Sequence, residues 1–137
     1  MEFVKNDGGR EAAGFKGNTG DCVVRAIAIA LELPYLDVYN TLYEASKAAG
    51  SRRPSPRNGV RPSVYRKFFD DNGWVWVPTM TVGSGCKVHL RAEELPSGRI
   101  VVRCSKHIVA VVDGVLHDTY DSSRDGGRCV YGYWRKG

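Results

Sequence analysis

Two strands and the tight turn between them can be read in one stretch, His107-Ile108-Val109-Ala110-Val111-Val112-Asp113-Gly114-Val115-Leu116-His117-Asp118. Asp-Gly between apolar residues is a strong signal for a two-residue type I′ turn. Such a turn also fixes the register, so Val109 pairs with Asp118. His107 and Asp118 then share one face of the hairpin as diagonal neighbours, with backbones roughly 7 Å apart. His117 falls on the opposite face.

The rest of the chain places helices before this hairpin and further strands around it. Apolar periodicity predicts helices over residues 22–31, 35–49 and 63–71, and a single helical turn over residues 92–95. Alternating apolar residues predict additional strands over residues 74–77, 99–104 and 128–134, and extend the second hairpin strand to Tyr120. Helices followed by an antiparallel sheet predict an α+β fold, with a buried N-terminal helix packed on a C-terminal sheet.

The first predicted helix opens with a cysteine. It runs from Cys22 to Leu31, is apolar almost all round and contains three alanines, which favours a helix buried inside the domain. Asp21 stands just before it, where a carboxylate can accept the free N–H groups of the first turn. Those N–H groups and the helix dipole also stabilise a thiolate, which lowers the pKa of such a cysteine from ~8.5. Buried cysteines are common, so Cys22 alone is a weak signal.

Length and composition set the frame. The chain has 137 residues, of which 42% are hydrophobic and 26% charged, as expected for one globular domain. We expect a flexible N-terminal arm over residues 1–20 and a single domain over residues 21–137. No apolar run approaches the ~20 residues of a membrane span. The start lacks a signal-peptide pattern, which predicts a cytoplasmic protein.

The charge is mildly basic, at +5. Such an excess favours an acidic partner and does not by itself establish nucleic-acid binding. Part of it is gathered in a basic cluster, which we define as Arg52, Arg53, Arg57, Arg61, Arg66 and Lys67.

The four cysteines are far apart and form no CxxC pair, so the sequence predicts no metal site and no cofactor. Disulfides are not expected in a cytoplasmic chain with a sufficient core. We therefore interpret Cys104 and Cys129 as packing residues and Cys86 as a loop residue.

Two segments together resemble the papain-like cysteine peptidases. Residues 19–28, Thr-Gly-Asp-Cys-Val-Val-Arg-Ala-Ile-Ala, are similar to the nucleophile segment of the ovarian-tumour-type deubiquitinases within that superfamily. The later segment from His107 to Asp118 resembles the strands that carry the His and the Asn or Asp of the same superfamily. With residues 130–134, Val-Tyr-Gly-Tyr-Trp, the pattern is also similar to small uncharacterised papain-fold proteins of bacteriophages.

The resemblance implies a papain-like fold and a role for each matching residue. Cys22 would be the nucleophile, His107 the general base and then acid, and Asp118 the carboxylate that orients the imidazole. The Cys22 backbone N–H would be one oxyanion donor. Papain-type enzymes place a Gln where this chain has Lys16, so the second donor would be the Asn18 side chain or a backbone N–H of residues 18–21.

Several functions remain open from sequence. The preferred one is a thiol hydrolase that cleaves a peptide or isopeptide bond in a protein with an acidic surface, in the cytoplasm (the host's, if the chain is phage-encoded). The same residues would support acyl transfer. A different class is a non-catalytic papain-fold interaction module, such as an inhibitor of a host protein. Nucleic-acid binding through the basic cluster is a third reading, and Asp121 is an alternative to Asp118.

Overall fold

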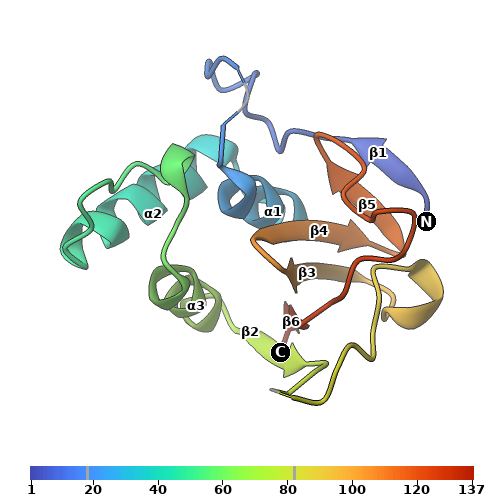
Figure 1. Ribbon diagram of the computed structural model, residues 1–137. Helices are drawn as coiled ribbons and strands as arrows, with labels where there is room; N and C mark the ends of the chain where they lie inside the picture. Colours follow the sequence, from blue (N-terminus) through green and yellow to red (C-terminus); the bar gives the residue numbers. More distant parts are fainter. Residues whose placement is uncertain (18, 82) are drawn as a thin grey trace.

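The computed structural model describes residues 1–17, 19–81 and 83–137 (Figure 1). Over these residues it is an α+β structure with three α-helices and one six-stranded mixed sheet. The helices are α1 (Cys22–Ala30), α2 (Tyr35–Ala48) and α3 (Pro62–Asp71). The strands are β1 (Phe3–Lys5), β2 (Trp74–Pro78), β3 (Arg99–Cys104), β4 (His107–Val112), β5 (Val115–Asp118) and β6 (Gly132–Lys136). Two 3₁₀ turns, η1 (Pro56–Asn58) and η2 (Ala92–Glu94), lie in the connections.

The sheet is built around the predicted hairpin. Its strand order is β1-β5-β4-β3-β6-β2, and every neighbouring pair is antiparallel except β1 with β5. Ala110 pairs with His117 and Val112 with Val115, which is the predicted register. Asp113 and Gly114 have φ of 48° and 78°, as a type I′ turn requires. The register prediction is therefore confirmed.

The core has two layers, one on each face of the sheet. Figure 1 shows the three helices on one side of the sheet, with α1 against it. All of α1 after Cys22 is buried, so this helix fills the space between the sheet and the other helices. On β3, Val101 packs in this helical layer, whereas Ile100 and Val102 belong to a second cluster on the opposite face. This alternation is what a strand covered on both faces requires.

The N-terminal segment differs from the expected flexible arm. Residues Phe3–Lys5 form an edge strand that pairs in parallel with β5, and the Asn6 side chain contacts His117. The Arg10 side chain is buried, with the residue 6% exposed. A three-residue strand is too short to give an alternating pattern, and Gly-rich sequence around it favours loop. The position of this segment at the edge of the sheet is therefore not predictable from local sequence.

The C-terminal strands also start and stop away from the predicted positions. β6 begins at Gly132 rather than at Arg128, and β5 ends at Asp118 rather than at Tyr120. Residues 128–130 instead pair with residues 88–90 through backbone hydrogen bonds and an isolated bridge between His89 and Cys129.

Two of the cysteines form a disulfide, which corrects the sequence interpretation. Cys86 and Cys129 are bonded across 43 residues of sequence, with their Cα atoms 5.8 Å apart. The pairing of residues 88–90 with residues 128–130 brings the two cysteines together, and no local pattern announces a contact over that separation. Cys22 and Cys104 carry free thiols.

Among the described residues, no helix combines the length and the apolar character that a bilayer span needs.

Candidate active site

The candidate nucleophile lies at the start of the central helix, α1. Cys22 is the first residue of α1 and is half-buried, whereas the residues that follow it in the helix are fully buried. It lines a cleft of about 540 Å³ together with His107. The unpaired N–H groups of the first helical turn favour negative charge at this position. The fold therefore brings Cys22 and His107, distant in sequence, to one solvent-accessible hollow.

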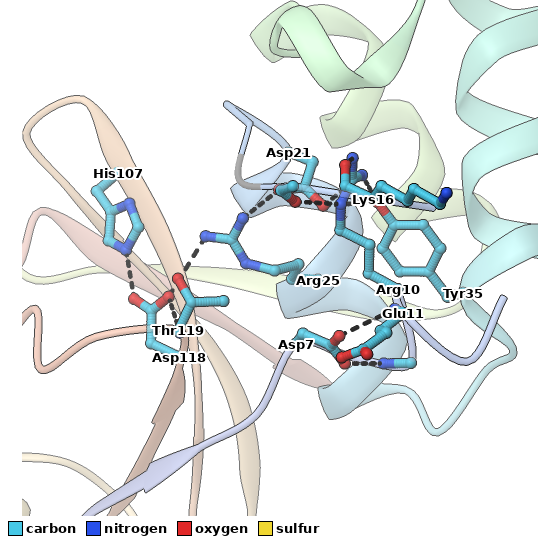
Figure 2. Close-up of polar contacts among 12 residues, drawn as sticks. Asp7, Arg10, Glu11, Lys16, Asp21, Arg25, Tyr35, His107, Asp118 and Thr119 are labelled. Atoms are coloured by element: carbon cyan, nitrogen blue, oxygen red, sulfur yellow. Dashed lines mark hydrogen bonds and ion pairs between the residues drawn. The ribbon is translucent and has the colours of Figure 1, made fainter. Parts of the chain in front are cut away.

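The predicted contact between the two hairpin strands is present. His107 is the first residue of β4 and Asp118 the last residue of β5, and both are buried. The His107 Nε2 and the Asp118 Oδ2 are 2.7 Å apart (Figure 2). Because Nε2 is occupied by the carboxylate, Nδ1 is the ring nitrogen left for the Cys22 thiol. This division fixes the ring orientation, as in other imidazole–carboxylate pairs.

The pKa values of the two groups move toward each other. Burial raises the pKa of the Cys22 thiol, but the polar and charged influence of the nearby His107 outweighs burial and holds that pKa below its ordinary value. Burial lowers the pKa of His107, but Asp118 and Cys22 together raise it to about 9. A lowered thiol pKa beside a raised imidazole pKa favours a thiolate–imidazolium pair.

Asp118 is held as an oriented, ionised acceptor. Its carboxylate accepts hydrogen bonds from the Ser122 hydroxyl and the Thr119 backbone N–H, each at 2.7 Å, and from the Arg25 Nη2 at 3.3 Å. Burial opposes ionisation, but the bonds from His107 and Ser122 lower the pKa of Asp118. The carboxylate therefore stays charged where it supports the imidazolium.

A buried charge network lies behind Asp118 (Figure 2). Arg25 bridges Asp118 to Asp21, with its Nη1 donating to the Asp21 carboxylate. Asp21 also accepts from the Tyr35 hydroxyl at 2.6 Å and from the Arg10 Nη1 at 3.3 Å. The Asp21 side chain is 0% exposed. Arg10 therefore links the N-terminal segment, through Asp21 and Arg25, to Asp118, the carboxylate that contacts His107.

This network corrects the expected role of Asp21 and adds residues that sequence reasoning missed. Asp21 does stand at the N-cap of α1, but its side chain makes no capping hydrogen bond because Arg10, Arg25 and Tyr35 occupy it. Arg25 is one of these residues, and the sequence signal for it is a single arginine four residues after an aspartate in an otherwise apolar helix. Ser122 gave no signal, since its contact with Asp118 depends on the chain turning back after β5.

The remaining sequence candidates fall into place as follows. Asp121 is exposed and accepts from the Ser123 backbone and hydroxyl, so Asp118 is the carboxylate that contacts His107. Lys16 is exposed, and its carbonyl oxygen accepts from Arg10. Asn18, the expected second oxyanion donor, lies outside the described residues.

The basic cluster is exposed along residues 52–67. Within it, Lys67 pairs with Asp71, and Arg61 donates to the Ala49 carbonyl.

The walls of the cleft come from four parts of the chain. They are the residues around the start of α1, the segment that enters α3, the β3–β4 turn, and two tyrosines after β5 and before β6. The lining includes Thr19, Gly20, Val60, Pro62, Tyr65, Arg103, Lys106, Tyr120 and Tyr131. A hollow of this size, with apolar and aromatic walls beside several polar and basic side chains, suits a short stretch of polypeptide.

Within the described part of the chain, no three His, Cys, Asp or Glu side chains gather in a way that could hold a metal ion. Comparisons of the chain with protein-family models, curated proteins and solved structures find no match.

Proposed function

We propose that the protein is a thiol hydrolase of papain-like architecture that cleaves a peptide or isopeptide bond. Cys22 acts as the nucleophile, His107 as general base and acid, and Asp118 as the orienting carboxylate. The observation that carries the proposal is the convergence of the three groups. A thiol at a helix start, with its pKa lowered by His107, shares a cleft with that imidazole, and Asp118 holds the imidazole from behind.

The proposed reaction begins with attack of the Cys22 thiolate on the carbonyl carbon of the amide, which forms a C–S bond. The His107 imidazolium gives its proton to the departing nitrogen as the C–N bond breaks, which leaves a thioester on Cys22. Water then gives a proton to the neutral His107 and attacks the thioester carbon. Cleavage of the C–S bond restores the thiolate and releases the carboxylic acid product.

The tetrahedral intermediates need donors for the negative oxygen. In this proposal one donor is the Cys22 backbone N–H at the start of α1, where helix N–H groups have no intrahelical acceptor. The Asn18 amide stays the proposed second donor.

Electrophilic substrate analogues test the proposal. A panel of short peptides and ubiquitin-like proteins that end in a vinyl methyl ester would be incubated with the wild type and with Cys22→Ala. We expect at least one member to add to the wild-type chain at Cys22, as read by intact mass and peptide mapping, and none to add to Cys22→Ala. His107→Ala should lose the adduct while keeping the fold.

The non-catalytic alternative predicts a different result. An interaction module would be modified by every analogue at the rate of an ordinary free thiol, and His107→Ala would leave that rate unchanged. This outcome would overturn the hydrolase proposal.

A further inference from the structure

We propose that the cleft beside Cys22 contains a subsite for a carboxylate of the substrate, formed by Arg103 and Lys106. The identification of the ligand as a substrate rests on the proposed function, whereas the binding of a carboxylate by these two residues does not. It names the substrate class as a polypeptide with a negative carboxylate close to the scissile bond.

The charge of the cleft has one sign. The charged side chains among its described lining are Arg25, Arg103 and Lys106, next to His107, and the described lining contains no Asp or Glu. Arg25 is already paired with Asp21 and Asp118. Among the described residues, no acidic side chain forms an ion pair with Arg103 or Lys106. These two cations therefore remain to pair with a ligand.

Arg103 lines the same cleft as Cys22 and His107. It precedes Cys104, which pairs with His107 across the β3–β4 ladder, and it pairs with Ile108. Its side chain is on the same sheet face as Val101, which packs in the helical layer that contains α1. The Tyr65 phenol, buried in the cleft wall, is within electrostatic range of both Arg103 and Cys22. Arg103 therefore shares the cleft with Cys22, where its charge acts on a substrate bound against the sulfur.

Lys106 immediately precedes His107, the first residue of β4. It occupies the β3–β4 turn with a φ of 54° and is exposed at the mouth of the cleft. A half-buried arginine and an exposed lysine line the same cleft as His107, and together they make this cleft attractive to anions. Of the two, the planar guanidinium fits a carboxylate with paired hydrogen bonds, whereas the ammonium acts as a point charge.

Two sources could supply the carboxylate: an internal Asp or Glu side chain, or the free C-terminus of a short peptide. Both present the same group to Arg103. A nucleic-acid phosphate is disfavoured because the walls that Val60, Pro62 and Tyr131 contribute to this cleft suit a polypeptide. The experiment separates these cases.

The first arm compares two reagents that alkylate Cys22, anionic iodoacetate and neutral iodoacetamide. The ratio of their rate constants reports the potential at the sulfur independently of the thiolate fraction. We expect Arg103→Gln to lower this ratio about fivefold, as loss of one partly screened charge at short range predicts. Arg103→Lys should largely preserve the ratio. Arg135→Gln, at an exposed arginine of β6 away from the described cleft lining, should leave it unchanged.

The second arm measures how well peptides protect Cys22 from iodoacetamide. Peptides with an internal Glu are compared with their Gln counterparts, and peptides with a free C-terminus with amidated ones. We expect protection from one acidic member of these pairs, reduced in Arg103→Gln and in Lys106→Gln. The pair that differs identifies the source of the carboxylate.

Some results would overturn the subsite. They are a rate ratio in Arg103→Gln equal to that of the wild type, equal protection by acidic and neutral peptides, or protection by a single-stranded oligonucleotide alone. Failure of the hydrolase proposal looks different. Both reagents would then label Cys22 no faster than a free thiol, and the rate ratio would still report whether the cleft selects anions.

Discussion

Replacing His107 with alanine is expected to slow alkylation of Cys22 by iodoacetamide about 100-fold at a pH near 6.5. In the wild type, His107 lowers the pKa of Cys22. The proposed thiolate–imidazolium pair would keep the sulfur ionised at that pH. Without the imidazole, the thiol pKa returns to the ordinary ~8.5, and burial raises it further. At most ~1% of the sulfur is then thiolate near pH 6.5. The rate constant follows from intact mass measured over time.

The activation of Cys22 by His107 also predicts how the alkylation rate changes with pH. Between the lowered pKa of Cys22 and the pKa of about 9 for His107, the wild type holds a thiolate–imidazolium pair, so its alkylation rate should change little with pH. The His107→Ala rate should instead rise tenfold for each pH unit up to the ordinary thiol pKa.

The second free thiol does not obscure this measurement. Cys104 is buried, and burial raises its pKa to about 11, so it stays protonated. Ile108→Ala, a change beside His107 that keeps the imidazole, serves as a control for loosened packing. Equal rates for wild type and His107→Ala near pH 6.5 would mean that the imidazole does not activate Cys22.

Asp21→Asn is expected to lower the free energy of unfolding by about 3–5 kcal/mol. The Asp21 carboxylate is fully buried and is the shared counterion of Arg10 and Arg25. The amide keeps the shape of the carboxylate but removes its charge, so two buried guanidinium groups lose a partner. Urea unfolding followed by circular dichroism measures the change, and failure of the variant to fold would be the extreme of the same result.

Asp71→Asn is the matched control for Asp21→Asn. Asp71 also pairs with a basic side chain, Lys67, but both groups are exposed. Such a surface pair contributes about 0.5 kcal/mol, because water and salt screen the interaction. If Asp21→Asn proved as stable as Asp71→Asn, the buried network would not be a stabilising element and its link to Asp118 would carry no weight.

The hairpin is the part of the fold and the site that the sequence predicted most fully. Asp113-Gly114 admits only a tight turn, and the turn sets the register, so the contact between His107 and Asp118 followed from local chemistry alone. The position of Cys22 at a helix start followed in the same way, from the abrupt change from Gly-rich to apolar sequence.

What the sequence did not reveal depends on contacts between distant segments. The disulfide joins Cys86 to Cys129 only because two irregular segments pair. The N-terminal strand has three residues, and a parallel edge contact of that length has no local pattern. Asp21 satisfied the local rule for a helix cap, but two arginines and a tyrosine brought in by tertiary packing compete for its carboxylate. At Asp21, the buried ion pairs override the local preference for helix capping.

The most direct test of the account is an ultraviolet titration of the Cys22 thiolate, taken as the difference between wild type and Cys22→Ala across pH. The account predicts thiolate absorbance that is already developed near pH 6.5, with a midpoint well below the ~8.5 of an ordinary thiol. A midpoint at or above that value would contradict it, because Cys22 would then be a protonated packing residue beside an unrelated histidine.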